Sequence, residues 1–262
     1  MDTAARPRLA VFKFSSCDGC QLSLLNLEGD LLAISEKVEI AYFAEASSAM
    51  ADGPYDIALV EGSITTPHEA ELIKTVRRNS KLLVTIGACA NAGGIQALRN
   101  WQDVGNFAHM VYATPAYIDS LAECTPIASH VAVDFAIQGC PVQKEQLLEV
   151  LTSLLMGFAP KLPAHSVCVE CKRRGNVCVL VAKGELCLGP LTHAGCGGLC
   201  PAFNRGCFGC FGPMESANTD ALVAQLQTLE HQKGDVQRML RTFNAYAEEF
   251  RSASDKLERG TA

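Results

Sequence analysis

The stretch CVECKRRGNVCVLVAKGELCLGPLTHAGCGGLCPAFNRGCFGC, residues 168–210, contains eight of the 13 cysteines in this chain of 262 residues. It is rich in Gly and Pro and has neither the periodicity of an amphipathic helix nor the alternation of a strand. We therefore expect coordinate or covalent bonds, rather than a packed apolar core, to hold this segment together. Its eight thiols can supply two sites of four ligands each.

The composition narrows the classes of protein to which this chain can belong. With 48% hydrophobic and 19% charged residues, it can bury a full core and a large partner surface. A net charge of −6, without a basic cluster interleaved with aromatics, argues against nucleic-acid binding. No apolar run is long enough for a signal peptide or a membrane span, and the N-terminal segment lacks a twin arginine. We therefore expect a cytoplasmic protein, in which clustered cysteines are typically metal ligands rather than disulfides.

The first part of the chain shows strands that alternate with helices. Five apolar runs are predicted to be buried strands: 9–14, 38–43, 56–60, 81–86 and 131–137. Helical patterns lie between or after them, over about 21–36, from Pro67 onward and over about 142–158. Continuous apolar strands alternating with helices are typical of a parallel sheet covered on both faces. The expected fold class is therefore α/β, with a flavodoxin-like, doubly wound parallel sheet.

We expect the chain to divide into three parts. These are a flavodoxin-like domain at 1–158, an irregular cysteine-rich segment at 159–213 and a helical tail at 214–262. The tail carries two apolar stripes at helical spacing, which we expect to pack on the body of the protein or on a partner. Its last residues, 252–262, are polar and are predicted to fray.

Four further cysteines lie just beyond strands of the predicted sheet. Cys17 and Cys20 follow the first strand, Cys89 follows the fourth, and Cys140 follows the fifth. The carboxyl ends of parallel strands form one rim, where ligands bind in open α/β sheets. Four thiolates from three loops can therefore converge there, with glycines that let the backbone approach a bulky inorganic group. Glu61, at the end of the third strand, is a candidate functional carboxylate on this rim, and helix capping is its alternative role.

Twelve of the cysteines could hold zinc ions, form disulfides or bind iron–sulfur clusters. Structural zinc sites typically use paired C-x₂-C elements, whereas the inner cysteines of the 168–210 segment are spaced singly. Iron–sulfur clusters with four thiolates each account for all twelve. Cys124 is the remainder, and we interpret it as a free thiol. His165 is a weaker candidate for a ligand, and His193 for a hydrogen-bond donor beside a site.

Several motifs follow one another along the chain: Cys17-x₂-Cys20, Val60-Glu61-Gly62-Ser63-Ile64, Gly87-x-Cys89 with Gly93-Gly94-Ile95, Gly139-Cys140-Pro141, Cys187-Leu-Gly-Pro-Leu-Thr-His-Ala-Gly-Cys196 and Cys207-Phe-Gly-Cys210. In this order they resemble those of the small, iron–sulfur subunit of nickel–iron hydrogenases, over roughly residues 9–213. The segments VCVECK and CGGLCP are most similar to the delta subunits of sulfhydrogenases, the bidirectional NAD(P)-linked hydrogenases.

The resemblance implies three 4Fe–4S clusters and assigns their ligands. Many periplasmic relatives have a histidine where Cys168 stands and a proline in place of the thiolate that Cys200 supplies, so four thiolates are expected at each cluster here. The proximal cluster would be held by Cys17, Cys20, Cys89 and Cys140. The distal cluster would be held by Cys168, Cys171, Cys178 and Cys187. The medial cluster would be held by Cys196, Cys200, Cys207 and Cys210.

The resemblance also implies partners, because this chain has no plausible nickel site. A large subunit would carry the nickel–iron centre that oxidises H₂ or reduces protons. Electrons would pass through the three clusters to flavin- and NAD(P)-binding, iron–sulfur diaphorase subunits. Two alternatives from other classes stay open. One is an iron–sulfur electron-transfer subunit of another redox complex, similar to quinone oxidoreductases, and the other is a zinc-stabilised interaction module.

Overall fold

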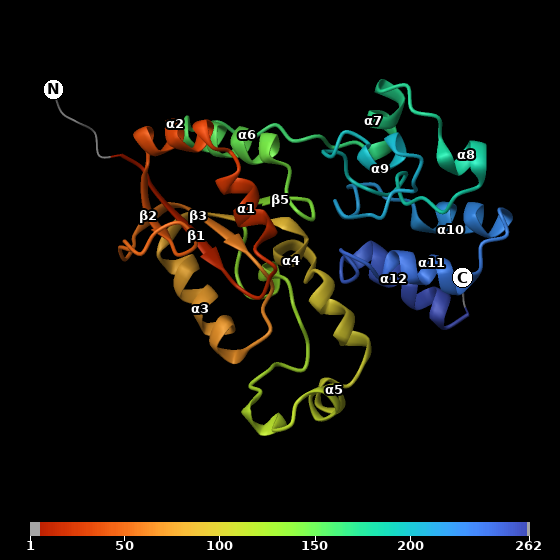
Figure 1. Ribbon diagram of the computed structural model, residues 1–262, viewed down its shortest axis with the longest axis horizontal. Helices are drawn as coiled ribbons and strands as arrows, with labels where there is room; N and C mark the ends of the chain where they lie inside the picture. Colours follow the sequence, from red (N-terminus) through yellow and green to blue (C-terminus); the bar gives the residue numbers. More distant parts are fainter. Residues whose placement is uncertain (1–5, 261–262) are drawn as a thin grey trace.

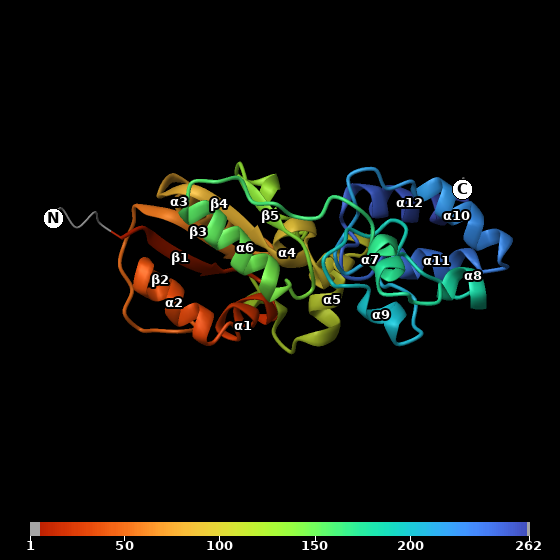
Figure 2. The same cartoon turned by 90° about the horizontal axis from the view of Figure 1, so that it is seen from above.

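The computed structural model describes residues 6–260, in which an α/β part lies beside a smaller helical part (Figures 1 and 2). Five parallel strands form one sheet in the order β2-β1-β3-β4-β5. This order reverses direction between β1 and β3, as in flavodoxin-like folds, and the predicted fold class is confirmed. The strands are β1 (Arg8–Lys13), β2 (Glu39–Phe43), β3 (Tyr55–Glu61), β4 (Ser80–Ile86) and β5 (Phe135–Ile137).

Helices cover both faces of the sheet. Alternate residues of each strand point to opposite faces, so that Val11 lies in one apolar core and Phe12 in the other. The first core includes α1, α2 and α6, and the second includes α3 and α4. The bounds of these helices are α1 (Gly19–Leu25), α2 (Gly29–Lys37), α3 (Pro67–Arg78), α4 (Gly87–Ala92) and α6 (Lys144–Leu155).

Two predicted elements are shorter in the structure than in the sequence pattern. The single helix expected over 21–36 is two helices, because Glu28 has a φ of 48° that no continuous α-helix accommodates. The fifth strand begins at Phe135 rather than at residue 131. Its predicted start is lost because the side chain of Asp134 accepts the Leu83 N–H at 2.7 Å, in place of a backbone carbonyl.

A long connection, residues 95–134, follows α4 and leads to β5, and we call it the excursion. It consists of short helices with few buried residues, and α5 has none. Its bounds are η1 (Ile95–Trp101), α5 (Val104–Val111), η2 (Pro115–Tyr117) and η3 (Ile127–Ser129).

The cysteine-rich segment has an apolar core, and the expectation that it lacks one is wrong. Val167, Leu188 and Leu191 are each at most 2% exposed, and they pack in one cluster with Leu226 and Phe250 of the tail. The apolar runs of the segment are too short to show a period, and their packing partners lie far along the chain. The segment contains α7 (Val167–Arg173), α8 (Val179–Lys183) and α9 (Leu199–Ala202). Its division from its neighbours at 158/159 and 213/214 stays a prediction.

The tail forms three helices, α10 (Thr219–Thr228), α11 (Lys233–Leu240) and α12 (Glu248–Glu258), where two stripes were predicted. The predicted fraying is wrong for residues 252–258, because α12 continues through them and buries Ala253 and Leu257. Residues 261–262 lie outside the described part of the chain. Within residues 6–260, no helix is long and apolar enough to cross a membrane.

The tail contacts the sheet part at Trp101 of η1. Its indole N–H donates to Asp255 Oδ1 at 2.9 Å, and the guanidinium of Arg241 lies 4.4 Å from the ring centroid. Arg241 also donates to Asp255 at 2.8 Å, and the ring of Tyr246 meets Trp101 edge-on. This small cluster joins elements that are far apart in the sequence.

Candidate metal centres

Hydrogen bonds tie together the loops that follow β1, β4 and β5. Gln96 Nε2 donates to the Ser15 carbonyl at 2.7 Å, and Ala88 N donates to the Gly139 carbonyl at 2.8 Å. These contacts gather four of the predicted ligands at the edge where the strand order reverses. Their thiols are close enough that charge on one raises the pKa of others: Cys17, Cys20, Cys89 and Cys140.

Glu61 holds the backbone of this site in place. It is 2% exposed, and its two carboxylate oxygens accept the N–H groups of Cys20 at 3.0 Å and Gln21 at 3.2 Å. Both N–H groups belong to the first turn of α1, whose own N-cap residue, Asp18, makes no side-chain cap. Burial raises the pKa of Glu61, and the hydrogen bonds offset this only in part. The structure therefore gives Glu61 the capping role, while a proton-transfer or interface role stays a prediction.

Two glycines leave room beside the thiols. Gly87 has a φ of +87°, and a Cβ at this position would lie 2.4 Å from the Cys20 sulfur. Gly94 has a φ of +66°, and a Cβ there would lie 2.5 Å from the Cys89 sulfur. Only glycine fits either position, both for its backbone conformation and for the space. These positions therefore form a cradle that the side chain of any other residue would fill.

Burial favours the neutral, protonated form of these thiols over the charged thiolate. It raises the pKa of Cys20 and of Cys140, and it raises the pKa of Cys89 to about 12. A metal that coordinates a thiol deprotonates it outright, so desolvated thiols with free space beside them suit bound iron. The donor set of four thiols is the one that a 4Fe–4S cluster uses.

The four cysteines predicted to hold the medial cluster line one cavity of about 340 Å³, together with Cys140 of the rim. The Cys207 sulfur lies 3.6 Å from Thr192 Oγ1. Burial, followed by charge on Cys196 and Cys200, raises the pKa of Cys210 to about 12. The rim site and this cavity are therefore immediate neighbours. The lining cysteines are Cys196, Cys200, Cys207 and Cys210.

The predicted distal ligands form a third group. Burial, followed by charge on Cys187, Cys171 and Cys178, raises the pKa of Cys168 to about 11. Cys178 is exposed, whereas Cys187 is buried. The backbone N–H of Cys207 donates to the Cys187 sulfur at 3.2 Å, so this group adjoins the medial one. The structure thus places the members of each predicted set near one another, but charge on Cys196 also raises the pKa of Cys171, and the division of the cysteines into three clusters stays a prediction.

The remaining candidates lie outside these groups. Cys124 is 0% exposed and its thiol donates to the Gly93 carbonyl at 3.3 Å. The Nδ1 atoms of His165 and His193 each lie within hydrogen-bond distance of a backbone carbonyl. All 13 cysteines are free thiols in the described chain. Within residues 6–260, no three His, Cys, Asp or Glu side chains converge on a single point that could hold one ion.

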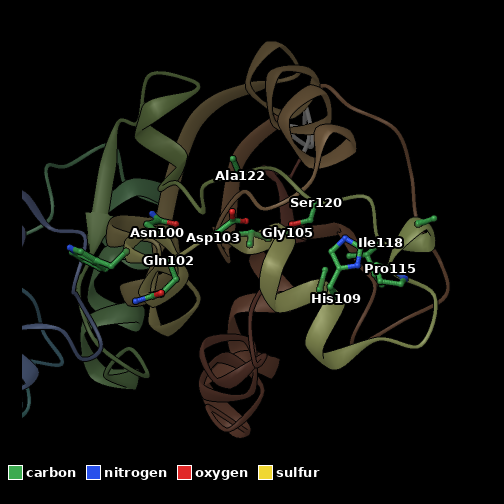
Figure 3. Close-up of a pocket in the computed structure, with 13 residues that line it drawn as sticks. Asn100, Gln102, Asp103, Gly105, His109, Pro115, Ile118, Ser120 and Ala122 are labelled. Carbon is green, nitrogen blue, oxygen red and sulfur yellow. The ribbon is translucent and has the colours of Figure 1, made fainter.

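Sequence reasoning missed a large hollow on the excursion between β4 and β5. It has a volume of about 1080 Å³ and no cysteine lines it. Figure 3 shows Asn100, Asp103, His109 and Ser120 around it, contributed by η1, α5 and the chain beyond η2. The surrounding surface is apolar, since Met110 is 72% and Tyr117 is 86% exposed. The signal in the sequence was the group of apolar residues between 104 and 112, which belongs to no strand of the predicted sheet.

Comparison with known proteins connects these sites to a family. The model of the family "NADH ubiquinone oxidoreductase, 20 Kd subunit" matches residues 17–154. The chain is 36% identical over 237 residues to sulfhydrogenase 2 subunit delta of Pyrococcus furiosus, covering 90% of this chain and 98% of that relative. It is 32% identical to a subunit of the F420-non-reducing hydrogenase vhu of Methanocaldococcus jannaschii, covering 80% of this chain and 83% of the relative.

Solved structures agree with this relationship. A chain of the NAD⁺-reducing NiFe hydrogenase in its H₂-reduced state matches with a TM-score of 0.56 and 30% identity. The match covers 60% of this chain and 96% of that chain. A chain of the NiFeSe hydrogenase of Dm. baculatum has the same fold, with a TM-score of 0.57 at 16% identity over 81% of this chain and 96% of that one. The chain therefore belongs to the family of the NADH ubiquinone oxidoreductase 20 Kd subunit, and within it to the small subunits of hydrogenases.

Proposed function

We propose that this chain is the electron-transfer subunit of a cytoplasmic nickel–iron hydrogenase and carries three 4Fe–4S clusters. By this proposal the rim group holds the proximal cluster, the cavity group the medial cluster and the third group the distal cluster. When bound, such a cluster takes up and releases one electron at a time. The H₂ chemistry belongs to a large subunit, since this chain contributes thiols and no nickel site.

One observation carries the proposal: the three groups of thiols adjoin each other in series. Cys140 of the rim group also lines the medial cavity, and Cys207 of the medial group donates to the sulfur of Cys187 in the distal group. The residues of this chain therefore support a continuous path from the rim of the sheet to the exposed Cys178. Their roles are to bind the clusters, to exclude water by burial and to donate N–H groups to sulfur.

We assign the large subunit to the surface beside the rim group. η1 begins at Ile95, directly after the Gly94 that adjoins Cys89, and Ile95 is 58% exposed. The apolar surface continues along the excursion through Met110, Val111 and Tyr117, which are 71% to 86% exposed. A permanent interface of this kind buries roughly 2,000 Å² or more. The hollow in Figure 3 would then receive side chains of the large subunit.

Flavin- and NAD(P)-binding diaphorase subunits are the proposed electron acceptors. The relative that supports this is the NAD-reducing hydrogenase HoxS subunit delta of Cupriavidus necator, which is 26% identical over 172 residues. The match covers 60% of this chain and 82% of that relative.

The test of the ligand assignment is Cys89→Ala in the hydrogenase complex purified without oxygen. Loss of one thiolate should remove the proximal cluster, so iron should fall by about four atoms per copy of this chain and H₂-dependent dye reduction should stop. Cys124→Ser is the matched control and should keep both iron and activity. An active Cys89→Ala complex would contradict the proximal assignment, and loss of iron from Cys124→Ser would identify Cys124 as a ligand.

Two alternatives make different predictions. An iron–sulfur subunit similar to those of quinone oxidoreductases needs only the rim group, and the 20 Kd subunit model indeed ends at residue 154. The near-full-length match to a hydrogenase subunit, which extends through the cysteine-rich segment, favours the hydrogenase. A zinc-stabilised module would contain zinc and no sulfide.

A further inference from the structure

Thr192 is a buried polar residue beside one of the proposed medial ligands. Its side chain lines the medial cavity, and the residue is 1% exposed. The Oγ1 atom of Thr192 lies 3.6 Å from the sulfur of Cys207, which is itself 4% exposed. Bulk water therefore has little access to the contact between this hydroxyl and this sulfur.

Backbone hydrogen bonds hold both residues of the contact in place. The N–H of Thr192 donates to the Leu188 carbonyl at 3.0 Å, and the Thr192 carbonyl accepts the N–H of Val167 at 2.9 Å. Leu188 in turn donates its N–H to the carbonyl of Cys207 at 2.9 Å. Because Leu188 is bonded to the backbone of both residues, the fold itself keeps the hydroxyl of Thr192 beside the sulfur of Cys207.

The hydroxyl of Thr192 has one proton and two acceptors within reach. In the structure it donates to the Leu188 carbonyl at 2.7 Å, while the Cys207 thiol donates to its oxygen. A thiol that binds iron loses its proton, so that Cys207 can then only accept, and a hydroxyl rotates to suit its partners. The Leu188 carbonyl also accepts the N–H groups of Leu191 and Thr192, each at 3.0 Å. This carbonyl therefore stays satisfied when the hydroxyl turns toward the sulfur.

We propose that the hydroxyl of Thr192 donates to the Cys207 thiolate when the medial cluster is bound, and that this hydrogen bond raises the reduction potential of that cluster. The inference rests on the proposed function, because it requires the cluster. Reduction adds one electron, and a donor aimed at a ligand sulfur stabilises the more negative state. Thr192 would act through Cys207, as a positioning residue and not as a ligand.

The test compares the medial potential in the complete wild-type complex and in its Thr192→Val and Thr192→Ser variants, by redox titration followed with electron paramagnetic resonance. Valine keeps the branched shape but lacks the donor, so the equilibrium constant for reduction of the medial cluster should fall about tenfold, or about 59 mV for one electron. Serine keeps the hydroxyl and should keep the wild-type potential. The potentials of the proximal and distal clusters and the iron content should stay the same in all three proteins.

Thr85→Val is the matched control. Thr85 is also 1% exposed, and its hydroxyl donates to a backbone carbonyl, that of Phe135, at 3.4 Å. Thr85 does not line the medial cavity, so the medial potential should not change in this variant. Thr192→Ala is a second variant without a hydroxyl, and it should lower the medial potential as Thr192→Val does.

Equal medial potentials in wild type, Thr192→Val and Thr192→Ala would overturn the inference. A shift in Thr192→Ser as large as that in Thr192→Val would also overturn it, because the hydroxyl would then not be the cause. Loss of the medial cluster from both Thr192→Val and Thr192→Ala would overturn it as well, since Thr192 would then hold the cluster rather than set its potential. A wild-type complex without a medial cluster overturns the proposed function, whereas three clusters with an unshifted medial potential overturn this inference alone.

Discussion

Glu61 links the sheet to the rim site through two hydrogen bonds. Its carboxylate accepts the N–H groups of Cys20 and Gln21 and so fixes the first turn of α1 beside the neighbouring thiols. A helix N-terminus that lacks its usual cap is stabilised by a negative charge, which here comes from a strand 40 residues further along the chain. The position of one ligand therefore depends on a residue that need not touch the cluster.

Glu61→Gln should lower the iron content per chain while the rest of the fold is kept. Glutamine keeps one acceptor but turns an NH₂ group toward one of the two N–H donors, which costs roughly 1–3 kcal/mol at a buried site. We expect a loss of up to about four iron per chain and a lower thermal midpoint, measured by metal analysis and circular dichroism. Glu28→Gln, on an exposed residue of the same region, should change neither quantity. Full iron content in Glu61→Gln would contradict the positioning role.

The cysteines that would bind the clusters could be predicted from the sequence, whereas the residues that position those cysteines could not. Cys17, Cys89 and Cys140 could be placed on one rim because each follows an apolar run, and strand ends converge in a parallel sheet. The contact between Glu61 and Cys20 depends on the register of β1 against β3, which no local pattern encodes. For the same reason Glu61 was left with two alternative roles.

At the scale of elements, Asp56 links β3 to its two neighbouring strands, β1 and β4, at the end of the sheet opposite to the rim. Its carboxylate accepts the Arg8 N–H of β1 at 2.7 Å and the Lys81 ammonium of β4 at 2.6 Å, from its own place on β3. The hydrogen bond from Lys81, followed by that from Arg8, lowers the pKa of Asp56. The charged form is therefore the one that stabilises the sheet.

Asp56→Asn should destabilise the protein at pH 7 and have less effect in acid. Because the folded pKa lies below the unfolded value of about 3.9, the stabilisation is complete above about pH 5 and is lost as pH falls through the folded pKa. Asp56 is partly exposed, so we expect a loss of roughly 1 kcal/mol in the free energy of unfolding at pH 7. Urea unfolding of both proteins at pH 7 and below about pH 3 measures the difference. A constant difference at both pH values, or an equal effect of the exposed Asp119→Asn, would contradict this assignment.

The local sequence pattern predicts the strands of the sheet well but does not predict where the helices end. The strands of the sheet were predicted because each is an apolar run with both faces buried. The helix break falls at Glu28, directly before Gly29, and a single glycine inside a helical pattern is too weak a signal to predict the φ of 48° found at Glu28. The second predicted helix of the tail forms two helices, α11 and α12. Helix α11 ends at Leu240, because residues 241–247 lie at the junction with Trp101 instead of continuing the helix.

At the scale of the whole molecule, two apolar systems are joined by a small polar and aromatic contact. One system surrounds the sheet, and the other unites the cysteine-rich segment with the tail. The second core could not be predicted, because its residues come from short runs far apart in the chain. Asp255 contributes to this contact by accepting hydrogen bonds from both Trp101 and Arg241.

Asp255→Asn should loosen this junction, and the single tryptophan of the chain reports on it directly. We expect a red shift of the Trp101 emission and a loss of about 1–2 kcal/mol in the free energy of unfolding, because a charged acceptor for two donors is lost. Glu215→Gln, on an exposed residue of the same half, serves as the control. Unchanged emission and stability in Asp255→Asn would show that the junction does not depend on this carboxylate.

The electron-transfer function rests on the proposal that twelve cysteines hold three 4Fe–4S clusters. We would therefore measure the content of iron, acid-labile sulfide, zinc and nickel in the complex purified without oxygen. Each copy of this chain should contribute about 12 iron and about 12 sulfide, in addition to the iron of the nickel–iron centre and of any diaphorase clusters, with nickel found only alongside a larger companion. About four iron per chain would confine the clusters to the rim group, and zinc without sulfide would contradict the electron-transfer function altogether.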